Sequence, residues 1–150
     1  MRLADWIKLY LNVAENSEFM EFEHAMCEGK KSRKQKRIAE DTAFSQVIRL
    51  YLLLGQTKEG RIDYRKIGDR LLAERVMRET DDDLILIFDR MAAHGVINYD
   101  AWAAFNVVTT SNAEAQARMR TRYKERSENA NAAKSAKAKK NQEGDRDGEP

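Results

Sequence analysis

Proline interrupts helices, and the only proline of this 150-residue chain is its last residue, Pro150. Glycine is also sparse, with seven residues in the whole sequence. Because few residues oppose helix formation, we expect a mostly helical protein. The length allows one compact domain with extensions. Charged residues make up 35% of the chain, which indicates that part of it lies outside any core.

The single cysteine, Cys27, excludes an internal disulfide and fits a reducing compartment. The first residues lack the long apolar segment of a signal peptide, and no apolar run approaches the length of a membrane span. We therefore expect a cytoplasmic protein that makes no use of a membrane.

The first half of the chain predicts one short strand and two helices. Apolar residues alternate with polar ones from Ile7 to Val13, a period of two that favours a strand. Ser17 is a candidate cap for a helix to about Glu28. A second, strongly apolar helix is expected to begin at Asp41 or Thr42 and to end at Gly55.

The second half predicts a short helix, a longer helix and a hairpin. We expect Asp63 to cap the short helix, and Thr80 or Asp81 to cap the longer one, which Gly95 ends. Two strands, Val96–Tyr99 and Phe105–Val108, then follow, joined by "DAWAA". The expected core residues of these helices are Ile67, Leu71, Leu84, Phe88 and Met91.

This order of elements predicts a mostly α protein with a small β-hairpin, arranged as a winged helix-turn-helix domain over residues 1–110. An N-terminal strand and helix extend it, and a basic helical tail follows. Residues 111–126 form the expected helical arm, with Ser111 and Glu114 as a capping box. Residues 127–150 lack apolar anchors, so we expect them to be disordered and dispensable for folding.

The net charge is small, but its distribution is uneven. Residues 1–110 hold 17 Lys/Arg and 18 Asp/Glu, whereas residues 111–150 hold 10 and 7. Positive charge gathers in residues 30–37, here named the basic cluster, and again in residues 118–140. Two such concentrations on one small protein make nucleic acid the leading partner.

The basic cluster admits three readings: a nuclear targeting signal, a solvated loop, or a contact with phosphate. We favour phosphate contact, because acidic residues occupy the first turn of the longer helix and positive charge must then come from elsewhere. The candidate DNA-binding residues are Lys30, Lys31, Arg33, Lys34, Lys36, Arg37, Arg65, Lys66, Arg70, Arg118, Arg120, Arg122, Lys124 and Arg126.

The acidic turn itself, Asp81–Asp83, is suited to capping free amides and to opposing the helix dipole. Three carboxylates at this end would repel phosphate, so we expect no base reading there. A zinc site needs more histidine and cysteine ligands at the right spacings than this chain offers, and no glycine-rich phosphate loop occurs. We therefore expect no cofactor, no metal and no enzymatic activity.

Three side chains leave alternatives open. Ile85 and Leu86 exceed what the core requires, so they are either covered by the N-terminal segment or form a dimer or partner surface. Trp102 is either packed or placed at the tip of the wing. We expect a monomer or a weak dimer.

The segment "DYRKIGDRLLAERVMRETDDDLILIFDRMAAHGVINYD" resembles the winged-helix pattern of bacterial and phage regulators. Together with "WIKLYLNV", "FSQVIRLYLLLGQTKEGRI" and "SNAEAQARMRTRYKER", the chain resembles the N-terminal domain of phage replisome organiser proteins over residues 5–126. The basic cluster is larger than that family would lead us to expect.

This resemblance implies binding to double-stranded origin DNA in replication initiation, recruitment of a helicase loader or replicative helicase, and no catalysis. It also implies that the cytoplasm is that of a bacterial or phage-infected host cell. Two alternatives remain. The first is a winged-helix transcriptional regulator. The second is a protein interaction module that binds DNA weakly, which the neutral body and Asp81–Asp83 favour.

Overall fold

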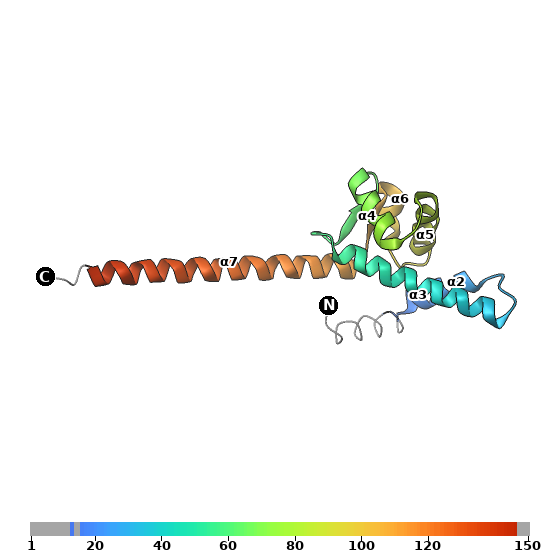
Figure 1. Ribbon diagram of the computed structural model, residues 1–150, viewed down its shortest axis with the longest axis horizontal. Helices are drawn as coiled ribbons and strands as arrows, with labels where there is room; N and C mark the ends of the chain where they lie inside the picture. Colours follow the sequence, from blue (N-terminus) through green and yellow to red (C-terminus); the bar gives the residue numbers. More distant parts are fainter. Residues whose placement is uncertain (1–12, 14–15, 147–150) are drawn as a thin grey trace.

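The computed structural model describes residue 13 and residues 16–146. Helices dominate it, as expected, and the strands are short (Figure 1). Among the described residues, no helix combines the length and hydropathy that a membrane crossing requires. The elements are α2 Ser17–Cys27, α3 Arg33–Gly55, β1 Arg61–Asp63, α4 Ile67–Met77, α5 Asp81–Ala93, α6 Tyr99–Phe105, β2 Val107–Thr109 and α7 Ser111–Arg146.

The long helix α3 is the central element of the body, and it contacts α2, α4 and α7. Helix α2 lies beside it, and α4, α5 and α6 gather on one side of it (Figure 1). Helix α7 leaves the body near the C-terminal end of α3 and projects away from the turn between α2 and α3 (Figure 1). The molecule is therefore a small helical body with one long projecting helix.

Helix α2 is confirmed, with one difference at its start. The side chain of Asn16, rather than Ser17, accepts the capping hydrogen bond from the Phe19 amide at 3.0 Å. Phe19 and Phe22 are buried, and the Phe19 ring meets Phe44 of α3 edge-on. The strand expected over residues 7–13 lies outside the described residues except for Val13, which is helical and buried.

Helix α3 begins eight residues earlier than expected, so its predicted start at Asp41 or Thr42 is wrong. A capping box explains the earlier start: Ser32 accepts from the Gln35 amide at 3.1 Å, and the Gln35 side chain reaches back to the Ser32 amide. The predicted end at Gly55 is confirmed.

The small antiparallel sheet exists, but it is not the expected hairpin. Strand β1 pairs with β2, and Ile62 lies opposite Val108. Residues 96–98 are not a strand, and "DAWAA" lies within helix α6 because Asn98 caps it through the Ala101 amide at 2.9 Å. The sheet therefore joins two distant segments, one before α4 and one after α6.

Three aromatic rings form the centre of the domain. Tyr64, Phe88 and Trp102 meet edge to face, with ring centroids 5.3–5.9 Å apart. Leu84, Phe88 and Met91 are fully buried, as predicted, and Trp102 is packed rather than presented to solvent. Each ring contacts the other two, and Phe88, which is fully buried, joins α5 to Tyr64 and to Trp102 of α6.

The prediction that Ile67 and Leu71 face the core is wrong. They are 71% and 58% exposed, because α4 turns Ala73 and Met77 inward instead. A small residue such as Ala73 lets a neighbouring helix approach closely. Asp63 does not cap this helix, since it lies in β1 and Lys66 occupies the cap position without a side-chain hydrogen bond.

Helix α7 packs against the body over its first residues and is exposed after Ala117, up to residue 141. The hydroxyl of Thr110, rather than Ser111, accepts from the Ala113 amide, and Glu114 pairs with Arg61 instead of completing a capping box. Gly60 has φ +70°, and a Cβ there would lie 2.5 Å from the Ala113 carbonyl oxygen, so only glycine fits beside this helix. After Ala117, residues 118–141 are exposed.

The helix also extends further than predicted. We expected it to stop near Arg126, with disorder beyond, but α7 continues to Arg146. The lack of a β-branched run or a proline over this stretch permits the continuation, although it contributes no buried side chain up to residue 141.

Replacing Phe88 with Ala should lower the free energy of unfolding by about 3–5 kcal/mol, because it empties the centre of the aromatic cluster. The matched control is Leu86→Ala on the same helix, whose side chain is 65% exposed and which should change stability by less than about 0.5 kcal/mol. Urea unfolding followed by circular dichroism measures both. Equal effects would contradict this core.

Removing residues 127–150 should leave the midpoint of thermal unfolding nearly unchanged, since residues 127–141 are all exposed. The helical signal at 222 nm should fall, because the shortened chain loses part of α7. A midpoint lower by many degrees would show that this segment packs on the body.

Candidate nucleic-acid interface

The basic cluster lies partly in the turn between α2 and α3 and partly in the first turns of α3. Lys30 and Lys31 precede the Ser32 cap, and the other four cations occupy the first turns of α3. All six side chains are exposed. Within the part of the chain that the structure describes, none of them forms an ion pair. The cluster therefore presents uncompensated positive charge on a rigid helix end.

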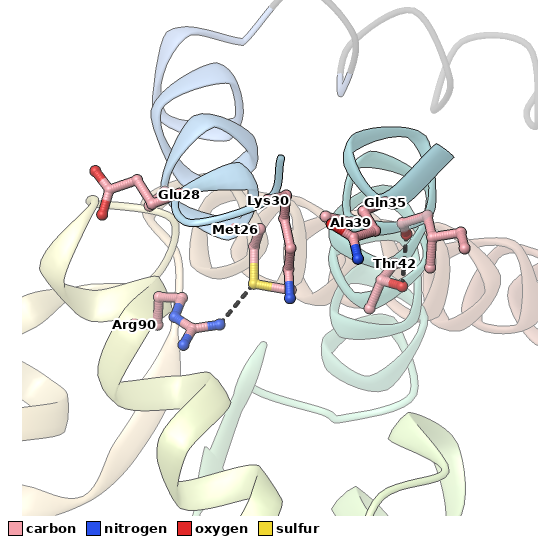
Figure 2. Close-up of a pocket in the computed structure, with 9 residues that line it drawn as sticks. Met26, Glu28, Lys30, Gln35, Ala39, Thr42 and Arg90 are labelled. Carbon is pink, nitrogen blue, oxygen red and sulfur yellow. Dashed lines mark hydrogen bonds between the residues drawn. The ribbon is translucent and has the colours of Figure 1, made fainter. Parts of the chain in front are cut away.

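A hollow of about 410 Å³ lies beside this cluster, between the end of α2, the first half of α3 and α5 (Figure 2). Lys30 and Arg90 direct their charged groups into it, whereas Glu28 points its carboxylate away from them (Figure 2). The Arg90 guanidinium donates to the Met26 sulfur at 2.6 Å and has no carboxylate partner among the described residues. The hollow therefore suits an anionic group.

Arg90 was not among the predicted site residues. It lies 60 positions from Lys30 in the sequence, near the end of a helix whose first turn is acidic, and no local pattern connects the two. The fold brings the two side chains to the same hollow, where Arg90 also contacts Met26 of α2.

The cations around the start of α4 are partly engaged within the protein. Arg65 donates to the carbonyl of Ala104 at 3.2 Å. Arg70 donates to the carbonyl of Tyr64 at 3.4 Å, and its guanidinium lies 5.7 Å from the centre of the Tyr64 ring. Lys66 is exposed without such contacts. These residues lie away from the basic cluster and do not extend it into one face.

The basic arm, residues 111–126, presents its cations on two sides of α7. At 100° per residue, Arg118, Arg122 and Arg126 share one side, and Arg120 and Lys124 lie on the other. Arg120 donates to the carbonyl of Gly55 at 3.1 Å, and this contact ties the arm to the end of α3. The other four cations have no protein partner among the described residues.

The basic cluster and the basic arm lie at opposite ends of α3 (Figure 1). Helix α3 has 23 residues. Its axis is therefore about 33 Å long at 1.5 Å per residue. This length is close to one turn of B-form DNA, roughly 34 Å. The two groups do not merge into one patch, and they lie at the two ends of a helix that is about as long as one turn of the duplex.

The acidic turn has a structural role. Thr80 caps the Asp83 amide and also donates to the Asp83 carboxylate, while the Tyr64 hydroxyl donates to the Asp81 carboxylate. Burial, and then this hydrogen bond and the charge of Asp81, raise the pKa of Tyr64 well above its usual range. No group of metal-binding side chains occurs among the described residues. The turn thus holds α5 to the β1–α4 connection.

The solvent side of α5 is acidic and apolar, not basic. Asp82 and Asp89 are exposed there, together with Ile85 and Leu86, which are 38% and 65% exposed. Asp89 also accepts from the Trp102 indole at 2.6 Å. No described segment covers the two apolar side chains. This surface is unsuited to the phosphate-lined groove of DNA.

Cys27 is a free, half-buried cysteine at the end of α2. Its sulfur donates to the Lys36 carbonyl at 3.7 Å, a weak contact. Partial burial, followed by the charges of Glu40 and Glu23, raises the pKa of Cys27 above its ordinary value.

Comparison with known proteins gives no relative. The chain matches no protein-family model, and no curated protein or solved structure matches it. The function must therefore be inferred from the geometry and the charge of this molecule.

The contribution of Tyr64 to stability should depend on pH. Its pKa is higher in the folded state than the ordinary value of about 10, so its contribution is complete below that pH and is lost as the pH rises above it. Urea unfolding should therefore show Tyr64→Phe less stable than the wild type at pH 8, with a smaller difference at pH 11. A constant difference would contradict this assignment.

Proposed function

We propose that this protein binds double-stranded DNA through the phosphate backbone, with α7 as the principal contact and the basic cluster as a second one. The observation that carries the proposal is the projection of α7 into solvent with unpaired cations. Residues 111–146 hold 10 Lys/Arg and 5 Asp/Glu, and residues 118–141 are all exposed, with Arg120 bound to the Gly55 carbonyl.

A helix that packs so few side chains against the body is not expected to be stable in water on its own. It buries no side chain beyond Ala117 up to residue 141, so packing does not stabilise that stretch. Cations on its two sides fit a helix that lies between the phosphates flanking the major groove, which is wide enough to admit it. Release of counterions from the duplex would then supply the free energy of binding and of ordering the helix.

The basic cluster adds a contact about one helical turn of DNA from the arm. Lys30 and Arg90 are placed to bind a phosphate in the hollow beside it. Both groups of cations act on the backbone, and the acidic surface of α5 offers no base reading. Binding should therefore depend strongly on salt and only weakly on DNA sequence.

The order α3–β1–α4–α5, closed by β2, supports a winged helix-turn-helix domain in which α6 replaces the strands of the wing. The resemblance to phage replisome organisers supports a role in replication initiation, at an origin and with a helicase loader or replicative helicase as partner. A gene for one of those partners beside this one would support that role over transcriptional regulation.

The salt dependence of DNA binding tests the proposal. Three variants remove two exposed cations each: Lys34→Ala with Arg37→Ala in the basic cluster, Arg118→Ala with Arg122→Ala in the arm, and Arg65→Ala with Lys66→Ala before α4 as the charge-matched control. The first two should lower the slope of log affinity against log salt by about two, because each phosphate contact contributes about 0.9. The control should leave the slope unchanged.

Fluorescence anisotropy with two unrelated duplexes measures affinity and slope, and each variant should weaken both duplexes alike. Equal slopes for the wild type and all three variants would make an interaction module the better account. The acidic and apolar surface of α5 is the specific observation that favours that second candidate.

A further inference from the structure

Two neighbouring helices each expose a pair of large aliphatic side chains. Ile67 and Leu71 are 71% and 58% exposed on α4, and Ile85 and Leu86 are 38% and 65% exposed on α5. Helices α4 and α5 contact one another and lie on the same side of α3 (Figure 1). No described segment covers either pair, and exposed apolar pairs on adjacent helices are typical of an association surface.

The charges around the two pairs have opposite signs. On α4, Arg75 continues the same side of the helix as Ile67 and Leu71, at a spacing of four residues, and Arg78 follows at the left-handed end of the helix; both arginines are exposed. On α5, the side that carries Ile85 and Leu86 also carries Asp82 and Asp89. Glu74 on α4 and Arg90 on α5 only partly offset this contrast.

We propose that two copies of this chain form a two-fold symmetric dimer in which α4 of each copy packs against α5 of the other. In such an interface, the same pair of surfaces is used twice. Both aliphatic pairs are then removed from water, and the arginines of α4 approach the carboxylates of α5. This association does not rest on DNA binding, because its four aliphatic residues and these charges lie outside the basic cluster and the basic arm.

Two other candidate partners for this surface would cover fewer of the four aliphatic side chains. The basic arm of a second copy, with its exposed Met119 and Tyr123, would complement α5 but would leave Ile67 and Leu71 in water. Nucleic acid on α4 would meet those two aliphatic side chains instead of cations, and it would leave Ile85 and Leu86 uncovered. Only the reciprocal pairing covers all four.

Sedimentation velocity of the full-length chain, at concentrations up to roughly 100 µM in low salt, should show a reversible dimer. Leu71→Asp and Leu86→Asp should each weaken association by about tenfold or more, since each places a charge in the apolar contact. Met119→Asp on the arm is the matched control and should have no effect. Circular dichroism confirms that each variant is folded.

A mixing experiment tests the reciprocal charges. Arg75→Glu and Asp82→Lys should each weaken self-association, because each homodimer then places like charges together. An equimolar mixture of the two variants should recover the dimer, since the mixed pair restores opposite charges at both contacts. Failure to recover would overturn the pairing of α4 with α5.

Other outcomes also decide the matter. A wild-type chain that stays monomeric throughout this range overturns the proposal, whatever its affinity for DNA. Loss of the dimer in Met119→Asp, with none in Leu71→Asp, would assign the contact to the basic arm instead. A dimer without DNA binding would leave this inference standing and refute the proposed function.

Discussion

The contact on which the rest of the fold depends is the cluster of Tyr64, Phe88 and Trp102. Each of the two polar rings is also tied by a hydrogen bond to a carboxylate of α5, from Tyr64 to Asp81 and from Trp102 to Asp89. The cluster thereby fixes α5 between the β1–α4 connection and α6. Acidic residues that would otherwise oppose DNA binding are used to hold these aromatic side chains.

The placement of α7 follows from this arrangement. Once α6 is docked through Trp102, β2 reaches β1, and the chain passes Gly60 so closely that a side chain there would clash with Ala113. Helix α7 therefore leaves the body in a fixed direction, with Arg120 bound to the end of α3. The start of α7 is thus held by the body, whereas most of the exposed cations along the helix have no partner among the described residues.

The sequence predicted what local patterns encode, including helix α2, the end of α3 at Gly55, the buried Leu84, Phe88 and Met91, and the turn at Gly95, where φ is positive. The sequence-based prediction failed where strands far apart in the chain pair, or where two segments could each start the same helix. Ser32 with Gln35 overrode the apparent start at Asp41, and the apolar alternation near Val96 did not reveal that β2 pairs with β1. The rotation of α4 depends on Ala73 at a helix contact, and hydrophobicity alone assigned Ile67 and Leu71 inward. The composition of the candidate site could be read from the sequence, but Arg90 and the separation of the two basic groups required the structure.

We propose that α7 is the DNA-binding element and that DNA stabilises its exposed part. Hydrogen exchange of the full-length protein, with and without a duplex of about three helical turns, tests this most directly. Amides of residues 118–141 should exchange rapidly in the free protein and become protected in the complex, while those of α4 remain unchanged. Unchanged exchange along α7 at saturating DNA, with protection appearing on α4 and α5 instead, would contradict the account.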